Sequence, residues 1–193
     1  SKGLPTKNMY GGFVYAPEMP YANLRIAARN YANQYGVRAI LWMQGETDAL
    51  YKTPRANYSR DLQSIMNRLG ADTGKRLTWV IARTSRTSAG FNIESDINPE
   101  IVAAQNAVLN TDFNPTYPGP ETDPLVPNRG DGTHFVGKGV NDKEGTIRAL
   151  TILANAWFGT LDAKFFSTVT PVNPVEVPAV TAACVTDNNG VTL

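Results

Sequence analysis

Apolar residues recur at the spacing of an α-helix in several segments of the chain, with polar residues between them. The pattern predicts helices over residues 23–35, 55–69, 99–109 and 141–157. Gly36 and Gly70 follow the first two helices as stop signals, and Pro99 suits the first turn of the third. In the last helix, the residues expected to face the core are Ile147, Leu150, Leu153, Ala154 and Trp157.

Two short apolar runs lie between these helices and predict buried strands, over residues 37–43 and 77–82. The alternation of helices and strands is typical of an α/β protein with a parallel sheet and helices on both faces. Two strands are too few for such a sheet. Either further strands lie in segments that look like loops, or part of the sheet is missing from this chain. The proline-rich residues 110–130 are predicted as one long loop, of a length that is often functional.

The composition changes after Phe166, so we expect one domain over residues 1–166 and a linker rich in Pro and Val over residues 167–180. Residues 181–193 carry β-branched residues on both sides of an Asn-Asn-Gly sequence, which is a hairpin signal. We interpret this end of the chain either as the start of a β-rich, immunoglobulin-like module or as a disordered tail.

Charge and composition exclude several classes of function. The net charge of +1 gives no electrostatic reason to expect nucleic acid or an anionic membrane as a partner. We also expect no membrane span, because no apolar run is long enough. The single cysteine, Cys184, cannot form an internal disulfide. The single histidine, His134, argues against a His-rich metal site and must supply any imidazole that the chemistry requires.

A carboxylate stands three residues before that histidine, in Gly130-Asp131-Gly132-Thr133-His134. A short loop of this kind can turn the Asp131 carboxylate back onto the imidazole, where it would fix the tautomer and stabilise the protonated ring. Asp-x-x-His is also common by chance, so the spacing alone favours a surface turn with an incidental histidine.

A second candidate site, Gln44-Gly45-Glu46-Thr47-Asp48, follows the first predicted strand. Ligands bind at the carboxyl ends of strands in open α/β sheets, and the Gln44 amide could donate to a developing oxyanion there. An acidic loop that caps the next helix is an equally good interpretation. The pair Gly11-Gly12 offers backbone N–H groups but is a weak signal by itself. We interpret four arginines as solvated or structural charges: Arg38, Arg83, Arg86 and Arg129.

Taken together, these segments resemble the sialate O-acetylesterase-like branch of the SGNH (GDSL-like) hydrolases, also grouped as carbohydrate esterase family six. The similar stretches are Leu41 to Ala49, the helix over residues 58–69, Val102-Ala103-Ala104-Gln105, and Gly130 to Phe135. They occur in the order of the family.

The resemblance implies a three-layer α/β/α sandwich, hydrolysis of acetyl esters on a carbohydrate or glycan, and no metal or organic cofactor. It implies His134 as general base, Asp131 as the residue that orients it, and Gln44 with a backbone N–H of Gly12 as the oxyanion hole. Gly45 and Glu46 would support these groups, Glu46 as a structural carboxylate.

One feature of the family is missing. Its nucleophilic serine lies in a Gly-Gln-Ser-like turn after the first strand, and no such sequence occurs here. Ser85 and Ser88 follow the second predicted strand in a polar run that does not match that turn. The low strand count and the missing serine both indicate that an N-terminal strand and its serine turn are absent, and that an upstream segment or another chain supplies them.

Two functions are compatible with these residues. The first is a carbohydrate O-acetylesterase that acts by serine acyl transfer, to which this chain contributes the Asp-His pair and the oxyanion-hole glutamine. The alternative is a non-catalytic carbohydrate-binding or scaffold module that has lost its nucleophile. The resemblance and the modular chain favour an extracellular or periplasmic location.

Overall fold

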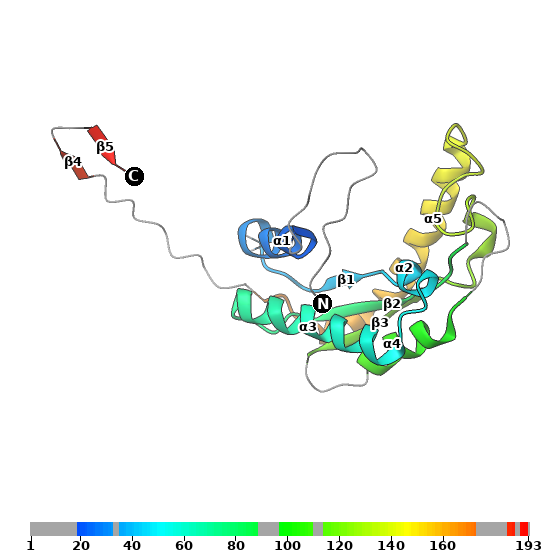
Figure 1. Ribbon diagram of the computed structural model, residues 1–193, viewed down its shortest axis with the longest axis horizontal. Coiled ribbons are helices and arrows are strands. Elements are labelled where there is room, and N and C mark those ends of the chain that lie inside the picture. Colours follow the sequence, from blue (N-terminus) through cyan, green and yellow to red (C-terminus); the bar gives the residue numbers. More distant parts are fainter. Residues whose placement is uncertain are drawn as a thin grey trace.

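The computed structural model describes residues 19–32, 35–88, 97–109 and 114–172, and two short strands near the end of the chain. Its centre is a parallel sheet of three strands in the order β1-β2-β3 (Figure 1). The strands are β1 (Ile40–Trp42), β2 (Trp79–Arg83) and β3 (Thr116–Glu121). The predicted α/β class with a parallel sheet is therefore confirmed.

Helices connect and follow these strands. They are α1 (Met19–Ile26) with its π-helical continuation η1 (Ala27–Tyr31), α2 (Glu46–Leu50), α3 (Arg55–Thr73), α4 (Pro99–Leu109), the 3-10 turn η3 (Val126–Asn128), α5 (Lys143–Thr160) and α6 (Ala163–Thr168). The bounds of α4 are those predicted. Helix α3 passes through Gly70 instead of ending before it, because Met66, Leu69 and Thr73 continue its buried stripe. The helix ends at Gly74, which has the left-handed φ of 64°.

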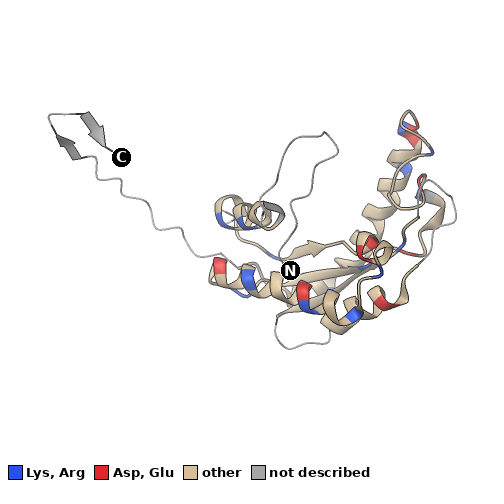
Figure 2. Cartoon of the chain, in the orientation of Figure 1, with Lys and Arg blue, Asp and Glu red and all other residues tan. Residues whose placement is uncertain are grey.

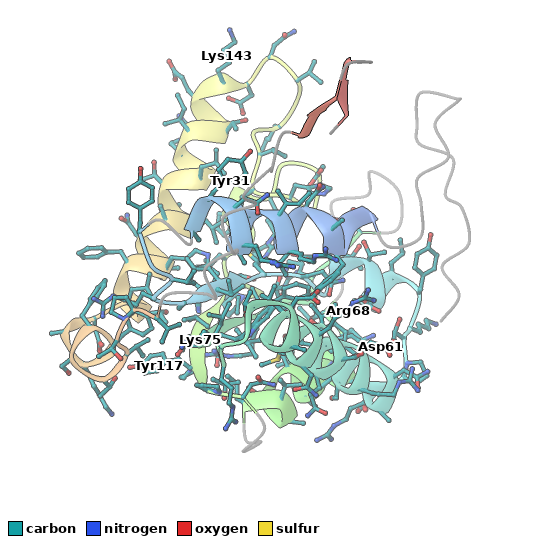
Figure 3. All side chains as sticks on the ribbon, turned by 90° about the vertical axis from the view of Figure 1, so that its left-hand side faces the viewer. Tyr31, Asp61, Arg68, Lys75, Tyr117 and Lys143 are labelled. Atoms are coloured by element: carbon teal, nitrogen blue, oxygen red, sulfur yellow. The ribbon has the colours of Figure 1, made fainter. Side chains whose placement is uncertain are left out.

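The strand register assigns the two faces of the sheet. Trp79 and Ile81 point to one face and belong to a single hydrophobic core with residues of α3 and α4. The row that points to the opposite face consists of Leu41, Val80 and Tyr117. On that face lies Tyr117, which Figure 3 labels. Its ring meets the ring of Phe165, in α6, edge-on, with the two ring centroids 5.2 Å apart. The sheet thus lies between α3 and α4 on one face and α5 and α6 on the other, which gives the expected three layers.

Strand β3 lies within the segment that was predicted as a loop, and that prediction is wrong for residues 116–121. Pro118 and Pro120 hide the strand in the sequence, because proline has no N–H to donate to a ladder. They are tolerated because β3 pairs only with β2 among the described residues. Gly119 is needed between them, since a Cβ atom there would lie 2.7 Å from the backbone nitrogen of Ala82.

Helix α5 packs through a stripe other than the predicted one. Ala149 is fully buried, whereas Ile147 and Leu150 are 64% and 51% exposed. The prediction that these two residues face the core is therefore wrong. The reason is that α5 contacts β3 and η3, which turns the side of the helix that carries Ala149 toward the sheet.

The packed part of the chain continues to Val172, which forms an antiparallel bridge with Val37. Further on, β4 (Val185–Asp187) and β5 (Gly190–Thr192) form an antiparallel pair with Asp187 opposite Gly190. The assignments of residues 167–180 as a linker and of residues 181–193 as a second module stay predictions. Basic and acidic residues occur together on helices such as α3 and α5 (Figure 2). Within the described ranges, no helix is long and apolar enough to cross a membrane.

Candidate active site

The carboxyl ends of the three parallel strands lie at one edge of the sheet, and polar residues follow each of them. Gln44 comes after β1, Thr84 directly follows β2, and Thr122 directly follows β3. The chain then runs through η3 into the loop of residues 129–135. The two candidate sites, far apart in the sequence, therefore both follow strands that end at the edge where ligands bind in open α/β folds.

The loop after η3 brings the predicted acid–base residues together. The Nδ1 atom of His134 lies 2.7 Å from Oδ2 of Asp131. The other carboxylate oxygen of Asp131 accepts the backbone N–H groups of Thr133 at 2.9 Å and of His134 at 2.6 Å. Gly132 has a φ of 80°, which permits this tight turn. A neutral His134 that donates from Nδ1 keeps Nε2 as a proton acceptor.

The surroundings of the pair favour an ionised carboxylate. Burial acts to raise the pKa of Asp131, but hydrogen bonds from the His134 ring and from two backbone N–H groups outweigh it, and the pKa lies below the usual value of 3.8. The His134 side chain is 73% exposed. Its Nε2 atom has no hydrogen-bond partner within the described part of the chain. The ring is thus held at Nδ1 and accessible to a reactant at Nε2.

Asp131→Asn is expected to flatten the acid side of the stability profile. Because the folded-state pKa of Asp131 is depressed, its contribution to stability is complete above the usual pKa of 3.8 and is lost as the pH falls through the folded-state value. Asparagine has no such titration. The difference in Tm between the native protein and Asp131→Asn should have its full size above pH 3.8 and shrink below that pH in thermal melts. A difference that stays constant with pH would contradict the pairing.

The predicted oxyanion donor, Gln44, forms hydrogen bonds through both its side chain and its backbone carbonyl. Its Nε2 atom donates to Oδ2 of Asp48 at 2.6 Å, which leaves a second amide hydrogen for another acceptor. Its carbonyl oxygen accepts from the Tyr58 hydroxyl at 2.6 Å and from Nε2 of Gln105 at 3.1 Å. A pocket of about 280 Å³ adjoins this residue and is lined by Trp42, Gln44, Asp48, Tyr58, Asp61, Leu62 and Ile65.

Gln105 joins the ends of β1 and β2, a role that the sequence did not reveal. It is fully buried in α4. Its Oε1 accepts from the Thr84 N–H at 3.0 Å, and its Nε2 lies 2.8 Å from the Thr84 carbonyl oxygen. Gly45 passes so close that a Cβ atom would lie 2.1 Å from the same carbonyl. The only sequence signal was a glutamine within the apolar stripe of α4, at a position where an amide requires buried partners.

Glu46 acts here as a structural carboxylate. Its two oxygens accept from Oγ1 of Thr84 at 2.9 Å and from the N–H of Gly45 at 3.0 Å. Its charge also acts on Arg129, in the loop that precedes His134. Burial lowers the pKa of Arg129, and the charges of Asp123 and Glu46 oppose that effect. The charges of residues 44–48, the Gln44 segment, and of residues 129–135, the Asp-His loop, are therefore close enough to interact.

None of the described serines is hydrogen-bonded to His134. Ser85 is buried, and its hydroxyl donates to Asp123 at 2.6 Å. The hydroxyl of Ser88 donates to the backbone carbonyl of Asp131 at 2.8 Å, and the N–H of Ser88 donates to the Thr133 hydroxyl. These contacts fasten the Asp-His loop to the segment after β2 but present no nucleophile. The remaining predicted site residue, Gly12, lies outside the described residues.

A three-layer α/β fold, with a histidine–carboxylate pair beyond the carboxyl edge of its parallel sheet, defines an SGNH-hydrolase-like domain. The family model described as carbohydrate esterase, sialic acid-specific acetylesterase, matches residues 11–122, more than half of the 193 residues, and the chain belongs to this family. The match includes Gln44, Glu46 and Gln105 and ends before the Asp-His loop. Comparison with curated proteins and with solved structures gave no match.

Proposed function

We propose that this chain supplies the general base and part of the oxyanion hole of a carbohydrate O-acetylesterase that acts by serine acyl transfer. The observation that carries the proposal is the 2.7 Å contact between His134 Nδ1 and Asp131 Oδ2, in the loop that follows the carboxyl end of β3. The substrate is an acetylated carbohydrate or glycan, the class that the description of the family names. No metal or organic cofactor takes part.

In the proposed reaction, Nε2 of His134 accepts the proton of a serine hydroxyl while the serine oxygen attacks the acetyl carbonyl. The Asp131 carboxylate stabilises the imidazolium that forms. The Gln44 amide donates to the oxyanion of the tetrahedral intermediate. His134 then returns the proton to the sugar hydroxyl that leaves, and an acetyl-serine remains. Water, deprotonated by the same histidine, then attacks the acetyl carbon of this ester. The bond to the serine oxygen breaks, the histidine returns the proton to that oxygen, and acetic acid leaves and ionises to acetate.

We place the nucleophilic serine outside the described residues, on an upstream segment or on another chain. Strand β1 pairs only with β2 within the described part, so a further strand could pair along its other side. If that strand were parallel to β1, the turn after it would lie at the same edge of the sheet as Gln44, because parallel strands end at a common edge. A serine in that turn would be on the side of the sheet where the histidine lies.

Acetate release from acetylated xylan and from O-acetylated sialic acid tests the function. This chain alone should be nearly inactive, and a form extended upstream into a Gly-x-Ser turn should release acetate. An extended form that contains such a serine and releases none would contradict the proposal. If the upstream sequence contains no such turn, and the protein binds acetylated glycans without cleaving them, the non-catalytic module is the better description.

Gln44→Ala is expected to lower kcat by about 100-fold in the serine-containing form, with a smaller effect on KM, because an oxyanion-hole donor acts mainly in the transition state. The measurement is steady-state acetate release. Asp48→Asn is the matched control, since it keeps an acceptor for the Gln44 amide at the same place. A Gln44→Ala enzyme with unchanged kcat would remove Gln44 from the oxyanion hole.

The location of the protein is also part of the proposal. An enzyme that acts on polymeric or surface glycans must meet them outside the cytoplasm, so we place it in the extracellular space or the periplasm. Cell fractionation followed by immunodetection tests this location. Recovery in the cytoplasmic fraction alone would contradict it.

A further inference from the structure

Arg129 is a buried cation next to the proposed general base. It is only 6% exposed, although the sequence gave no reason to distinguish it from solvated arginines. It directly follows η3 and is the first residue of the loop of residues 129–135 that carries the Asp-His pair. A long cationic side chain is rarely buried to this extent without a specific requirement.

Its contacts fix both chain neighbours of His134. One terminal nitrogen, Nη1, donates to the carbonyl of Thr133, and the guanidinium lies 4.2 Å from the ring centroid of Phe135. The other, Nη2, donates to the carbonyl of Thr122 at 2.9 Å and to its hydroxyl at 3.2 Å. The guanidinium therefore ties the residues before and after His134 to the end of β3.

This arrangement is energetically demanding. The Nε atom of Arg129 is buried and has no hydrogen-bond partner among the described residues. A buried unsatisfied donor is unfavourable, and an apolar side chain of similar size would fill the space without removing a charge from water. Stability alone is thus a poor reason for an arginine here. A planar group that reaches two carbonyls and stacks on a ring has geometric specificity that neither a methionine nor a lysine has.

We infer that Arg129 is a positioning residue, which holds His134 so that Nδ1 meets Asp131 and Nε2 stays available to the reactants. The inference rests on the proposed role of the Asp131–His134 pair. The guanidinium itself touches no reacting atom. Its effect passes through the backbone of Thr133 and the ring of Phe135.

The test uses the tautomer of His134, which nitrogen NMR reports without assignment because the chain has one histidine. At a pH where the ring is neutral, the native chain should hold the proton on Nδ1. In Arg129→Met, the ratio of the Nδ1–H to the Nε2–H form should fall at least about threefold, as expected when a hydrogen bond of ordinary strength is weakened. Arg129→Lys should give an intermediate fall. Arg148→Met, which removes an exposed arginine on α5, is the matched control and should leave the ratio unchanged.

Asp131→Asn separates this inference from the proposed function. If Asp131→Asn changes the ratio and a folded Arg129→Met does not, the positioning role is overturned and the Asp-His pair stands. If Asp131→Asn also leaves the ratio unchanged, both the positioning role of Arg129 and the proposed Asp-His pair are overturned. Near-UV circular dichroism reports whether Arg129→Met is folded. If Arg129→Met is not folded, the tautomer ratio is measured in Arg129→Lys and in Phe135→Leu instead. A ratio equal to that of the native chain in both variants would overturn the inference.

Discussion

Replacing His134 with alanine is expected to lower kcat/KM for acetyl-ester hydrolysis by about 10⁴-fold or more in the serine-containing form of the protein. The chain has no second histidine that could take over as base. The ring is exposed, and its loop is held by bonds that do not involve the imidazole: the Asp131 carboxylate accepts the N–H of Thr133, and the Thr133 hydroxyl accepts the N–H of Ser88. The substitution should therefore leave the fold intact. Acetate release, measured beside thermal melts of both forms, gives the result.

Lys138→Ala is the matched control for this substitution, since Lys138 is an exposed residue that shortly follows His134 in the chain. It should retain native activity. Added imidazole should restore part of the activity of His134→Ala, because the missing group is then replaced by a diffusible base. Near-native turnover by His134→Ala without imidazole would refute the assignment of the general base.

Replacing Gln105 with leucine is expected to lower the free energy of unfolding by about 3 kcal/mol, since it leaves buried backbone groups without partners. Both the N–H and the carbonyl of Thr84 lose the amide, and the carbonyl of Gln44 keeps only the Tyr58 hydroxyl. Urea unfolding measures the change. Because Gln105 joins the ends of β1 and β2, the loss should appear in the midpoint of a single cooperative transition.

Gln63→Leu is the control for this change, since Gln63 is a half-buried glutamine on α3. It should alter the free energy of unfolding by less than about 0.5 kcal/mol. A similarly small effect of Gln105→Leu would mean that the leucine and a rearranged backbone satisfy the site. The hydrogen bonds of Gln105 would then not explain how β1 and β2 are joined.

The fold was predictable where local signals and packing agree. Helix α4 has the predicted bounds because Pro99 suits the first turn and the apolar stripe of the helix is the one that is buried. Strand β3 was not predictable, since Pro118 and Pro120 contradict a strand until its place at the side of the sheet is known. The buried stripe of α5 depends on the direction from which β3 approaches it, which apolar periodicity does not contain.

The residues of the candidate site were likewise predictable from the sequence only in part. Asp131 and His134 are close in sequence, so a short turn can join them, and a single histidine narrows the choice. Gln105 and Arg129 act only through residues brought close by the sheet. The only local signal for Gln105 is its place within the apolar stripe of α4, and nothing in the local sequence distinguishes the buried guanidinium of Arg129 from a solvated one. The sequence thus identified the groups proposed to react, and the tertiary structure was needed to find those that hold them.

The prolines of β3 also affect which side of the sheet can pair with a further strand. Two of the six residues of β3 have no N–H, so this strand is a poor template for another chain. Strand β1 has the sequence Ile-Leu-Trp, without proline or charge, and Leu41 is 49% exposed. Among the described strands of this sheet, β1 is therefore the better template for unwanted association between copies. The strand proposed to carry the serine would occupy that same side, so it would complete the enzyme and protect it from aggregation at once.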